Sequence, residues 1–136
     1  MKNYIYLLLV LFLFSCNEKK KIDLGRGYRF DYDPIWSEDY MIFGINKNIF
    51  GNIISFDFDS IYIIVQQKPR EIILKNTFNN PEITYRKQEQ IFKESTLRQY
   101  WIINKINNIT YGPYTKEEFQ QKREELGVPK KLQLKE

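Results

Sequence analysis

One stretch of this chain limits the possible folds more than any other, because it is apolar on both sides. Side chains of an extended strand point alternately to the two faces of a sheet. For the segment 61–67, one face carries Ile61, Ile63 and Val65, and the other carries Tyr62, Ile64 and Gln66. Both faces are largely apolar, so the segment is expected to be a central strand rather than an edge strand.

The segments around this strand have the lengths and spacings of an antiparallel meander. Short runs rich in Ile, Phe and Tyr alternate with turn residues, which is typical of strands joined by hairpins. We expect strands at 28–32, 41–45, 49–58 and 61–67, a short edge strand at 71–75, and a hairpin formed by 100–105 and 109–112.

The best-defined helix lies near the C-terminus. Thr115 and Glu118 have the T-x-x-E spacing of a capping box, and Gly127 is a typical residue just beyond a helix end. These signals predict a helix at 116–126.

A second, more polar helix is expected at 82–94, because Asn80 and Pro81 form a start signal. These elements together predict an α+β fold. We expect an antiparallel meander of about five to seven strands with one or two helices packed on one face.

The N-terminal segment resembles the signal peptide of a bacterial lipoprotein. Tyr4–Phe14 is an apolar run of eleven residues, shorter than the roughly 20 residues that span a bilayer, and it fits the apolar region of a secretory signal. Leu13-Phe14-Ser15-Cys16 resembles a lipobox, although Phe14 is bulkier than the residue usual at its position. The resemblance implies cleavage before Cys16 and lipidation of Cys16 with palmitate-type acyl chains. An ordinary signal peptide or an N-terminal helix that contains a Cys is the alternative.

These features divide the chain into four parts. We expect a signal peptide at 1–15, a polar tether at 16–27, one domain at 28–127 and a charged, mobile tail at 128–136. The tether lacks an Asp directly after Cys16. In this respect the chain resembles lipoproteins that face the periplasm from an outer membrane. We therefore expect a cell-envelope protein held at the membrane through Cys16.

The composition excludes several kinds of chemistry. The chain has no His and a single Cys, which excludes catalytic triads with His, imidazole acid–base catalysis and His-based zinc sites. A net charge of +4 is ordinary for a soluble domain and does not indicate binding to nucleic acid. We expect no cofactor and no catalytic residues.

Four carboxylates are weak candidates for a metal or catalytic site. The chain contains the motif F-D-aromatic-D twice, and the carboxylates belong to Asp31, Asp33, Asp57 and Asp59. If the two strands were neighbours, these groups could bind Ca²⁺ or act as a glycosidase-like pair. The alternative is that each Asp hydrogen-bonds locally in or near a turn.

The aromatic content of 16% is high and gives a candidate binding surface. Exposed Trp and Tyr side chains are typical of such surfaces, and the candidates are Trp36, Trp101, Tyr111 and Tyr114. The alternative is that these rings fill the core and its rim.

A short motif at a predicted turn stands apart from these candidates. Asp59-Ser60-Ile61 resembles a three-residue O-glycosylation acceptor pattern known from some Gram-negative bacteria. A pattern of this length also arises by chance.

Two longer segments carry family resemblances. A strand like Ser55–Gln67, followed by a C-terminal block like Tyr100–Gly127, is similar to a family of small uncharacterised bacterial lipoproteins. The resemblance supports the fold and the location but implies no activity.

A second likeness is confined to the C-terminal block. Its W-x-I…YGPYTKEEF pattern resembles the opening of GYF-like modules, which recognise peptide segments, although this chain ends before the later half of such a module.

From these observations we expect a lipid-anchored envelope protein that is not an enzyme. It would bind an envelope or secreted protein, for example as an inhibitor or immunity-type protein. The alternatives are a hydrolase that uses the Asp cluster and a structural subunit of an envelope complex.

Overall fold

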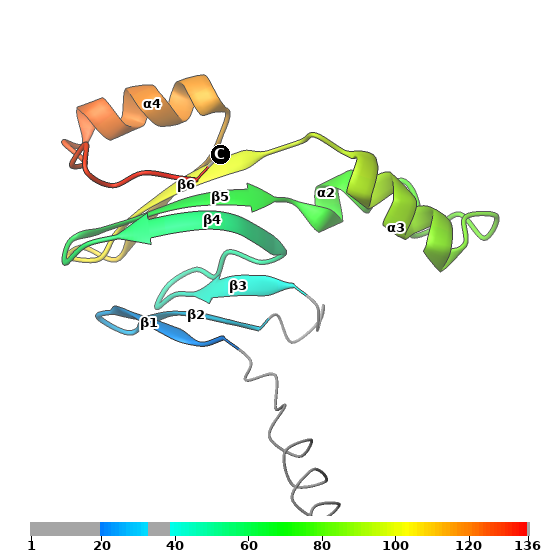
Figure 1. Cartoon of the computed structure of the whole chain (residues 1–136), viewed down its shortest axis with the longest axis horizontal. Helices are drawn as coiled ribbons and strands as arrows, with labels where there is room; N and C mark the ends of the chain where they lie inside the picture. Colours follow the sequence, from blue (N-terminus) through cyan, green and yellow to red (C-terminus); the bar gives the residue numbers. More distant parts are fainter. Residues whose placement is uncertain (1–19, 33–38, 136) are drawn as a thin grey trace, which may run out of the picture.

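The computed structural model describes residues 20–32 and 39–135 and has an α+β fold. Figure 1 shows its elements, which are β1 (Ile22–Gly25), β2 (Tyr28–Tyr32), β3 (Tyr40–Phe43), β4 (Asn52–Phe58), β5 (Tyr62–Lys68), α2 (Arg70–Leu74), α3 (Tyr85–Glu94), β6 (Gln99–Asn104), β7 (Ile109–Tyr114) and α4 (Lys116–Glu125). The strands form two antiparallel sheets, with the orders β1-β2-β3 and β4-β5-β6-β7. The predicted fold class and antiparallel meander are confirmed.

The strand β5 lies inside the four-stranded sheet and is covered on both faces, as its sequence predicts. Ile63 and Val65 face the three-stranded sheet and belong to the core between the two sheets. Ile64 faces the opposite way, into a second core beneath α4. The molecule therefore has three layers, with the four-stranded sheet in the middle (Figure 1).

The strands supply alternating positions to the two cores, and the second core also takes residues from α4 and the C-terminal segment. The buried residues of the core between the sheets are Leu24, Tyr28, Phe30, Ile42, Ile49, Ile53, Ile63, Val65, Trp101 and Ile103. The buried residues of the second core are Ile64, Tyr100, Ile102, Phe119, Val128 and Leu132. Trp101 thus lies on the face of β6 that points toward the three-stranded sheet, whereas its neighbours Tyr100 and Ile102 point toward α4.

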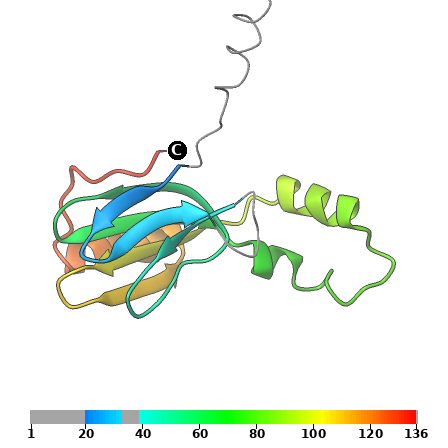
Figure 2. The same cartoon turned by 90° about the horizontal axis from the view of Figure 1, so that it is seen from below.

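The prediction of an edge strand at 71–75 is wrong, because this segment forms the short helix α2. Arg70 and Leu74 are four residues apart, lie on the same side of the helix and are both buried. With α3, this helix forms an arm that lies beyond one end of the sheets (Figure 2). The helix α3 starts at Tyr85 rather than at residue 82, because Thr84 caps it by accepting a hydrogen bond from the Lys87 N–H.

The C-terminal helix agrees closely with its sequence signals. The Thr115 side chain accepts a hydrogen bond from the Glu118 N–H, and the Glu118 carboxylate accepts one from the Thr115 N–H, which completes the capping box. Gly127 follows the helix with a φ of +67°. This left-handed conformation suits glycine and ends the helix.

The tether predicted at 16–27 is too long, because β1 lies within it. Ile22 and Leu24 alternate with polar residues, and Leu24 is fully buried in the core between the sheets. The first strand therefore adds an edge to the three-stranded sheet. The signal segment and Cys16 lie outside the described residues.

The charged tail predicted at 128–136 is also wrong for the described residues, because the segment packs against the four-stranded sheet. Val128 and Leu132 are buried in the second core. The N–H groups of Gln133 and Lys135 donate hydrogen bonds to the Asp57 carboxylate and the Ser55 hydroxyl, at 2.9 and 2.8 Å. The segment thus helps α4 to cover that face of the sheet.

We expect the substitution Leu132→Ala to lower the free energy of unfolding by about 2–5 kcal/mol, because it leaves a cavity under the C-terminal segment. Urea denaturation measures the change. The control Lys130→Ala, at an exposed position in the same segment, should change stability by less than about 0.5 kcal/mol. Equal, small effects of both substitutions would contradict the packing of this segment.

Candidate functional site

A small groove opens beside Trp101, where the connection between β3 and β4 passes α2. Its volume is about 220 Å³, and its lining includes Lys47, Phe50, Gln67, Ile72, Trp101 and Pro113. Phe50 is 43% exposed and Ile72 is 51% exposed, whereas Trp101 is only 7% exposed. Most small-molecule pockets have volumes of roughly 300–1,000 Å³. This groove is therefore better matched to one or two side chains of another protein.

The neighbouring strand β7 comes very close to β6 at Trp101. A Cβ atom added to Gly112 would lie 2.7 Å from the Tyr100 carbonyl oxygen and 3.1 Å from the Trp101 ring. Any larger residue would push β7 away from β6. The glycine of the Gly112-Pro113 pair therefore allows the close approach, and Pro113 lies in the groove wall.

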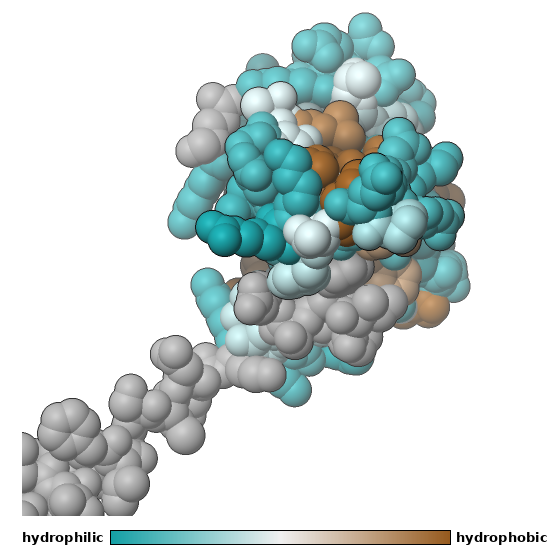
Figure 3. All heavy atoms as spheres, turned by 90° about the vertical axis from the view of Figure 1, so that its right-hand side faces the viewer, coloured by the Kyte–Doolittle hydropathy of each residue, from teal (hydrophilic) through white to brown (hydrophobic). Residues whose placement is uncertain are grey.

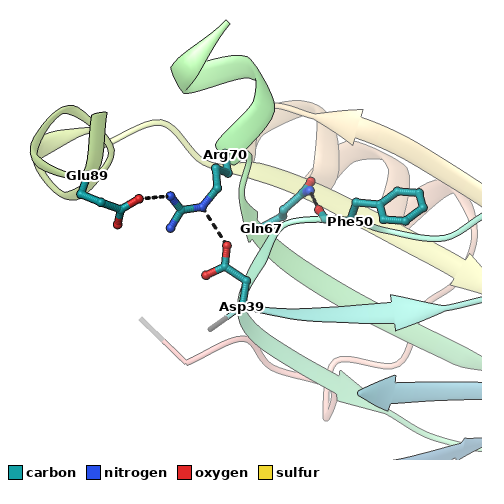
Figure 4. Close-up of polar contacts among 5 residues, drawn as sticks. All are labelled: Asp39, Phe50, Gln67, Arg70 and Glu89. Carbon is teal, nitrogen blue, oxygen red and sulfur yellow. Dashed lines mark hydrogen bonds and ion pairs between the residues drawn. The ribbon is translucent and has the colours of Figure 1, made fainter. Parts of the chain in front are cut away.

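The polar groups around the Trp101 ring are hydrogen-bonded to one another. The Trp101 indole N–H donates to the Gln67 side-chain carbonyl at 2.7 Å. The Gln67 amide donates in turn to the backbone carbonyl of Phe50, as Figure 4 shows. With the indole donor in use, this part of the groove offers a surface for apolar contact.

Two exposed side chains of opposite charge lie at the groove. The Lys47 ammonium nitrogen lies 4.7 Å from the centroid of the Trp101 ring, close enough for a cation–π contact. The second exposed charge is that of Glu71, which lies on α2 and also lines the groove. The groove thus combines an apolar floor with a rim that has both signs of charge.

A buried ionic cluster holds α2 in place beside the groove. Figure 4 shows Arg70 between two carboxylates. Its Nε donates to Asp39 at 2.9 Å and its Nη1 donates to Glu89 at 2.6 Å. The Phe92 ring packs against the guanidinium, with its centroid 3.8 Å from Cζ. Because Asp39 precedes β3 and Glu89 lies on α3, one side chain joins three segments and fixes the position of Ile72.

The charges near this cluster shift the pKa of two groups. Burial acts to lower the pKa of Arg70, but the hydrogen bonds and charges of Glu89 and Asp39 outweigh it and raise this pKa. Burial lowers the pKa of Lys68, and the positive charges of Arg98 and Arg70 lower it further. The Lys68 ammonium donates to the Lys93 carbonyl near the end of α3, at 3.1 Å, which places a cation at the negative end of the helix.

Figure 3 shows the end of the molecule that carries α2 and α3, where apolar residues gather inside a polar rim. The exposed Ile72 belongs to α2 at this end. Such a patch on a protein surface marks a candidate interaction site.

The structure separates the aromatic residues predicted to form a binding surface. Trp101 lies at the groove, whereas Tyr111 and Tyr114 pack on the opposite face of the sheet, against the core beneath α4. Trp36 lies outside the described residues. Phe50 and Ile72 are not among the predicted site residues, because both lie in segments expected to be strands. No local signal marks the helix that carries Ile72, because the ion-pair partners of Arg70 lie in distant parts of the chain.

The predicted carboxylate cluster is not brought together within the described residues. Asp31 lies in the three-stranded sheet, 3.4 Å from the Lys21 ammonium, and its carboxylate also accepts a hydrogen bond from the Tyr32 N–H. Asp57, on the other sheet, accepts hydrogen bonds from two backbone N–H groups. Among residues 20–32 and 39–135, no three His, Cys, Asp or Glu side chains lie close enough to hold a metal ion. Asp33 lies outside these ranges.

Asp59 hydrogen-bonds locally in a turn, which is the alternative to a metal or catalytic role given above for the Asp residues. Its Oδ1 accepts hydrogen bonds from the N–H groups of Ile61 and Tyr62, both at 2.8 Å. Burial acts to raise its pKa, but these two hydrogen bonds and the positive charges of Lys131 and Lys105 outweigh it and lower the pKa.

Comparison with known protein families gives a match over most of the chain. Residues 33–136 match a family described as "Protein of unknown function (DUF3997)". The chain belongs to this family. No curated protein and no solved structure matches the chain, and the likeness to GYF-like modules is not shown. Within the described residues, no helix of this DUF3997 protein is long and apolar enough to cross a membrane.

We expect Asp39→Ala to destabilise the DUF3997 protein by about 3–5 kcal/mol, because it leaves the buried Arg70 without one carboxylate. Glu89→Ala should lower the free energy of unfolding by only about 1 kcal/mol. The Glu89 side chain is 21% exposed, so water can replace its carboxylate as a hydrogen-bond partner of Arg70. Urea denaturation measures both values, with Glu94→Ala on the exposed side of the same helix as the control. A larger loss from Glu89→Ala than from Asp39→Ala would contradict this ranking.

The lowered pKa of Asp59 predicts a pH-dependent contribution to stability. A carboxyl group whose pKa is lower in the folded state stabilises the protein above its unfolded pKa, about 3.9. This contribution is lost as the pH falls through the folded pKa. We therefore expect the stability difference between the wild type and Asp59→Asn to be present at neutral pH and to shrink on acidification below about pH 4.

Urea titrations at a series of pH values measure this difference. The control Ser60→Ala, in the same turn, should keep the pH profile of the wild type. A difference between wild type and Asp59→Asn that stays constant from neutral to acidic pH would contradict the assigned role of the carboxylate.

Proposed function

We propose that this DUF3997 protein is a lipid-anchored protein of the bacterial cell envelope, and that its domain binds another protein. The apolar run Tyr4–Phe14 and the lipobox-like sequence ending at Cys16 support the anchor. More than one acyl chain on Cys16 would give stable membrane attachment, which a single chain does not. The domain would face the periplasm and meet envelope or secreted proteins.

The groove beside Trp101 is the observation that carries the binding proposal. Phe50 and Ile72 expose apolar surface in the same groove as Trp101, whose indole N–H is already bonded to Gln67. Such a groove suits an apolar side chain, because a polar one would lose its hydrogen bonds to water there without replacement. We therefore propose that an apolar side chain of the partner occupies the groove.

The proposed activity is binding rather than catalysis. The absence of His and of any Cys other than Cys16 supports this, and so does the local hydrogen bonding of Asp31, Asp57 and Asp59. An inhibitor or immunity-type protein is a specific form of the proposal, because such a protein needs only a shaped surface on a tether. No observation on the described residues favours the alternative hydrolase or a structural subunit.

A capture experiment with paired variants tests the proposal. We expect the wild-type protein, isolated from membranes, to retain a partner. The variant Ile72→Glu should retain at least tenfold less of this partner. The introduced carboxylate would have to be desolvated in the contact. The control Ile106→Glu should retain the partner, since Ile106 is as exposed as Ile72, at 54%, but lies in the β6–β7 turn.

The variant Cys16→Ser tests the anchor separately. We expect it to leave the membrane fraction and to keep the affinity of the purified domain for the captured partner. If Ile72→Glu and Ile106→Glu lose the partner equally, or if the wild type retains no partner, binding at the groove is contradicted. A Cys16→Ser variant that stays in the membrane fraction would contradict the lipid anchor.

A further inference from the structure

The motif Asp59-Ser60-Ile61 forms the tip of the hairpin between β4 and β5. The Asp59 N–H donates to the Tyr62 carbonyl at 3.0 Å, so Ser60 and Ile61 are the two residues of the turn. Ser60 is exposed, and Ile61 is 40% exposed. All three residues of the motif are therefore presented at a surface turn, where an enzyme can reach them.

The backbone on both sides of Ser60 is fixed by other groups. Asp59 accepts the hydrogen bonds of the two N–H groups that follow Ser60. The Lys105 ammonium donates to the Asp59 carbonyl, and the Lys105 N–H donates to the Ile61 carbonyl at 2.8 Å. Lys105 itself is only 3% exposed and also donates to the Leu24 carbonyl at 2.5 Å. The turn is thus tied to both sheets and has one defined shape.

The hydroxyl of Ser60 differs from those of the other serines in the described ranges. The Ser55 hydroxyl accepts a hydrogen bond from the Lys135 N–H, and the Ser95 hydroxyl accepts one from the Leu97 N–H. In the part of the chain that the structure describes, the Ser60 hydroxyl makes no hydrogen bond to another residue. It is an exposed nucleophilic group for which the fold has no evident structural use.

We infer that Ser60 is the acceptor of an O-linked glycan. The inference rests on the proposed function, because export places the turn in the compartment where lipid-linked sugars are available. The co-reactant is a sugar linked through diphosphate to a lipid carrier. The Ser60 oxygen forms a bond to the anomeric carbon, and the bond from that carbon to the diphosphate breaks. The diphosphate leaves with the electron pair, and the hydroxyl proton passes to a base of the transferase.

The structure accounts for the residue types on either side of the acceptor. Asp59 sets the shape of the turn through its two hydrogen bonds, and Ile61 presents an apolar side chain beside the hydroxyl. A transferase that recognises these three residues can do so on the folded protein. A glycan at this tip would project from the end of the hairpin without displacing any core side chain.

Mass spectrometry of the full-length protein, purified from the source cells, tests this inference. We expect the wild type to carry added mass in steps of sugar residues, and peptide mapping to place it on Ser60. Ser60→Ala should lose this mass completely, Ser60→Thr should keep it, and Ser95→Ala should match the wild type. Thermal denaturation would show that the Ser60 variants remain folded.

Several outcomes would overturn the inference. These are an unmodified Ser60, a phosphate in place of sugar, or a glycan only at another residue. A chain that is lipidated on Cys16 but unmodified at Ser60 would overturn the inference about the glycan and would still support the proposed anchor. A glycan on Ser60 of an exported chain that carries no lipid would support the acceptor role and contradict the anchor.

Discussion

The need to cover both faces of β5 determines the layer order of this protein. Ile63 and Val65 require an apolar partner on one side, and Ile64 requires one on the other. The neighbouring strand β6 repeats this division, with Trp101 on the side of Val65 and Ile102 on the side of Ile64. A slip of one residue in register would exchange the two sets. Each fully buried side chain of this kind contributes about 1.5–3 kcal/mol, so the packing of the two outer layers fixes the register of the middle one.

Two of the buried cations, Arg70 and Lys105, add polar links between elements. Arg70 has carboxylate partners and joins the helical arm to the strands. Lys105 donates to the carbonyl oxygens of Leu24 and Asp59, and joins the first strand to the β4–β5 turn. Burial lowers the pKa of Lys105 despite the attraction of nearby Asp59, which reflects the cost of removing an ammonium group from water. Both side chains define the position of a surface element that carries a proposed role.

The sequence predicts the elements whose signals are local and misses those that depend on distant partners. The central strand and the capped helix at 116–125 follow from alternation and from a capping box. The Ile-rich run of α2 predicts a strand because it has high β-propensity. The ion pairs of Arg70 with Asp39 and Glu89, which hold this segment as a buried helix, come from distant parts of the chain. Similarly, the short, charged sequence of 128–135 hides a buried leucine, Leu132, whose partners lie in earlier strands.

The same distinction applies to the candidate site. High aromatic content alone could not separate Trp101 from Tyr111 and Tyr114, because only the register of β6 and β7 shows that they lie on opposite faces. The groove also depends on Ile72, which lies on the same short helix as Arg70, and Arg70 joins that helix to two other segments. An arm fixed before binding loses less conformational entropy when a partner arrives. In the proposed binding, the buried ionic cluster would therefore contribute without touching the partner, because it holds the helix that carries the apolar Ile72 at the groove beside Trp101.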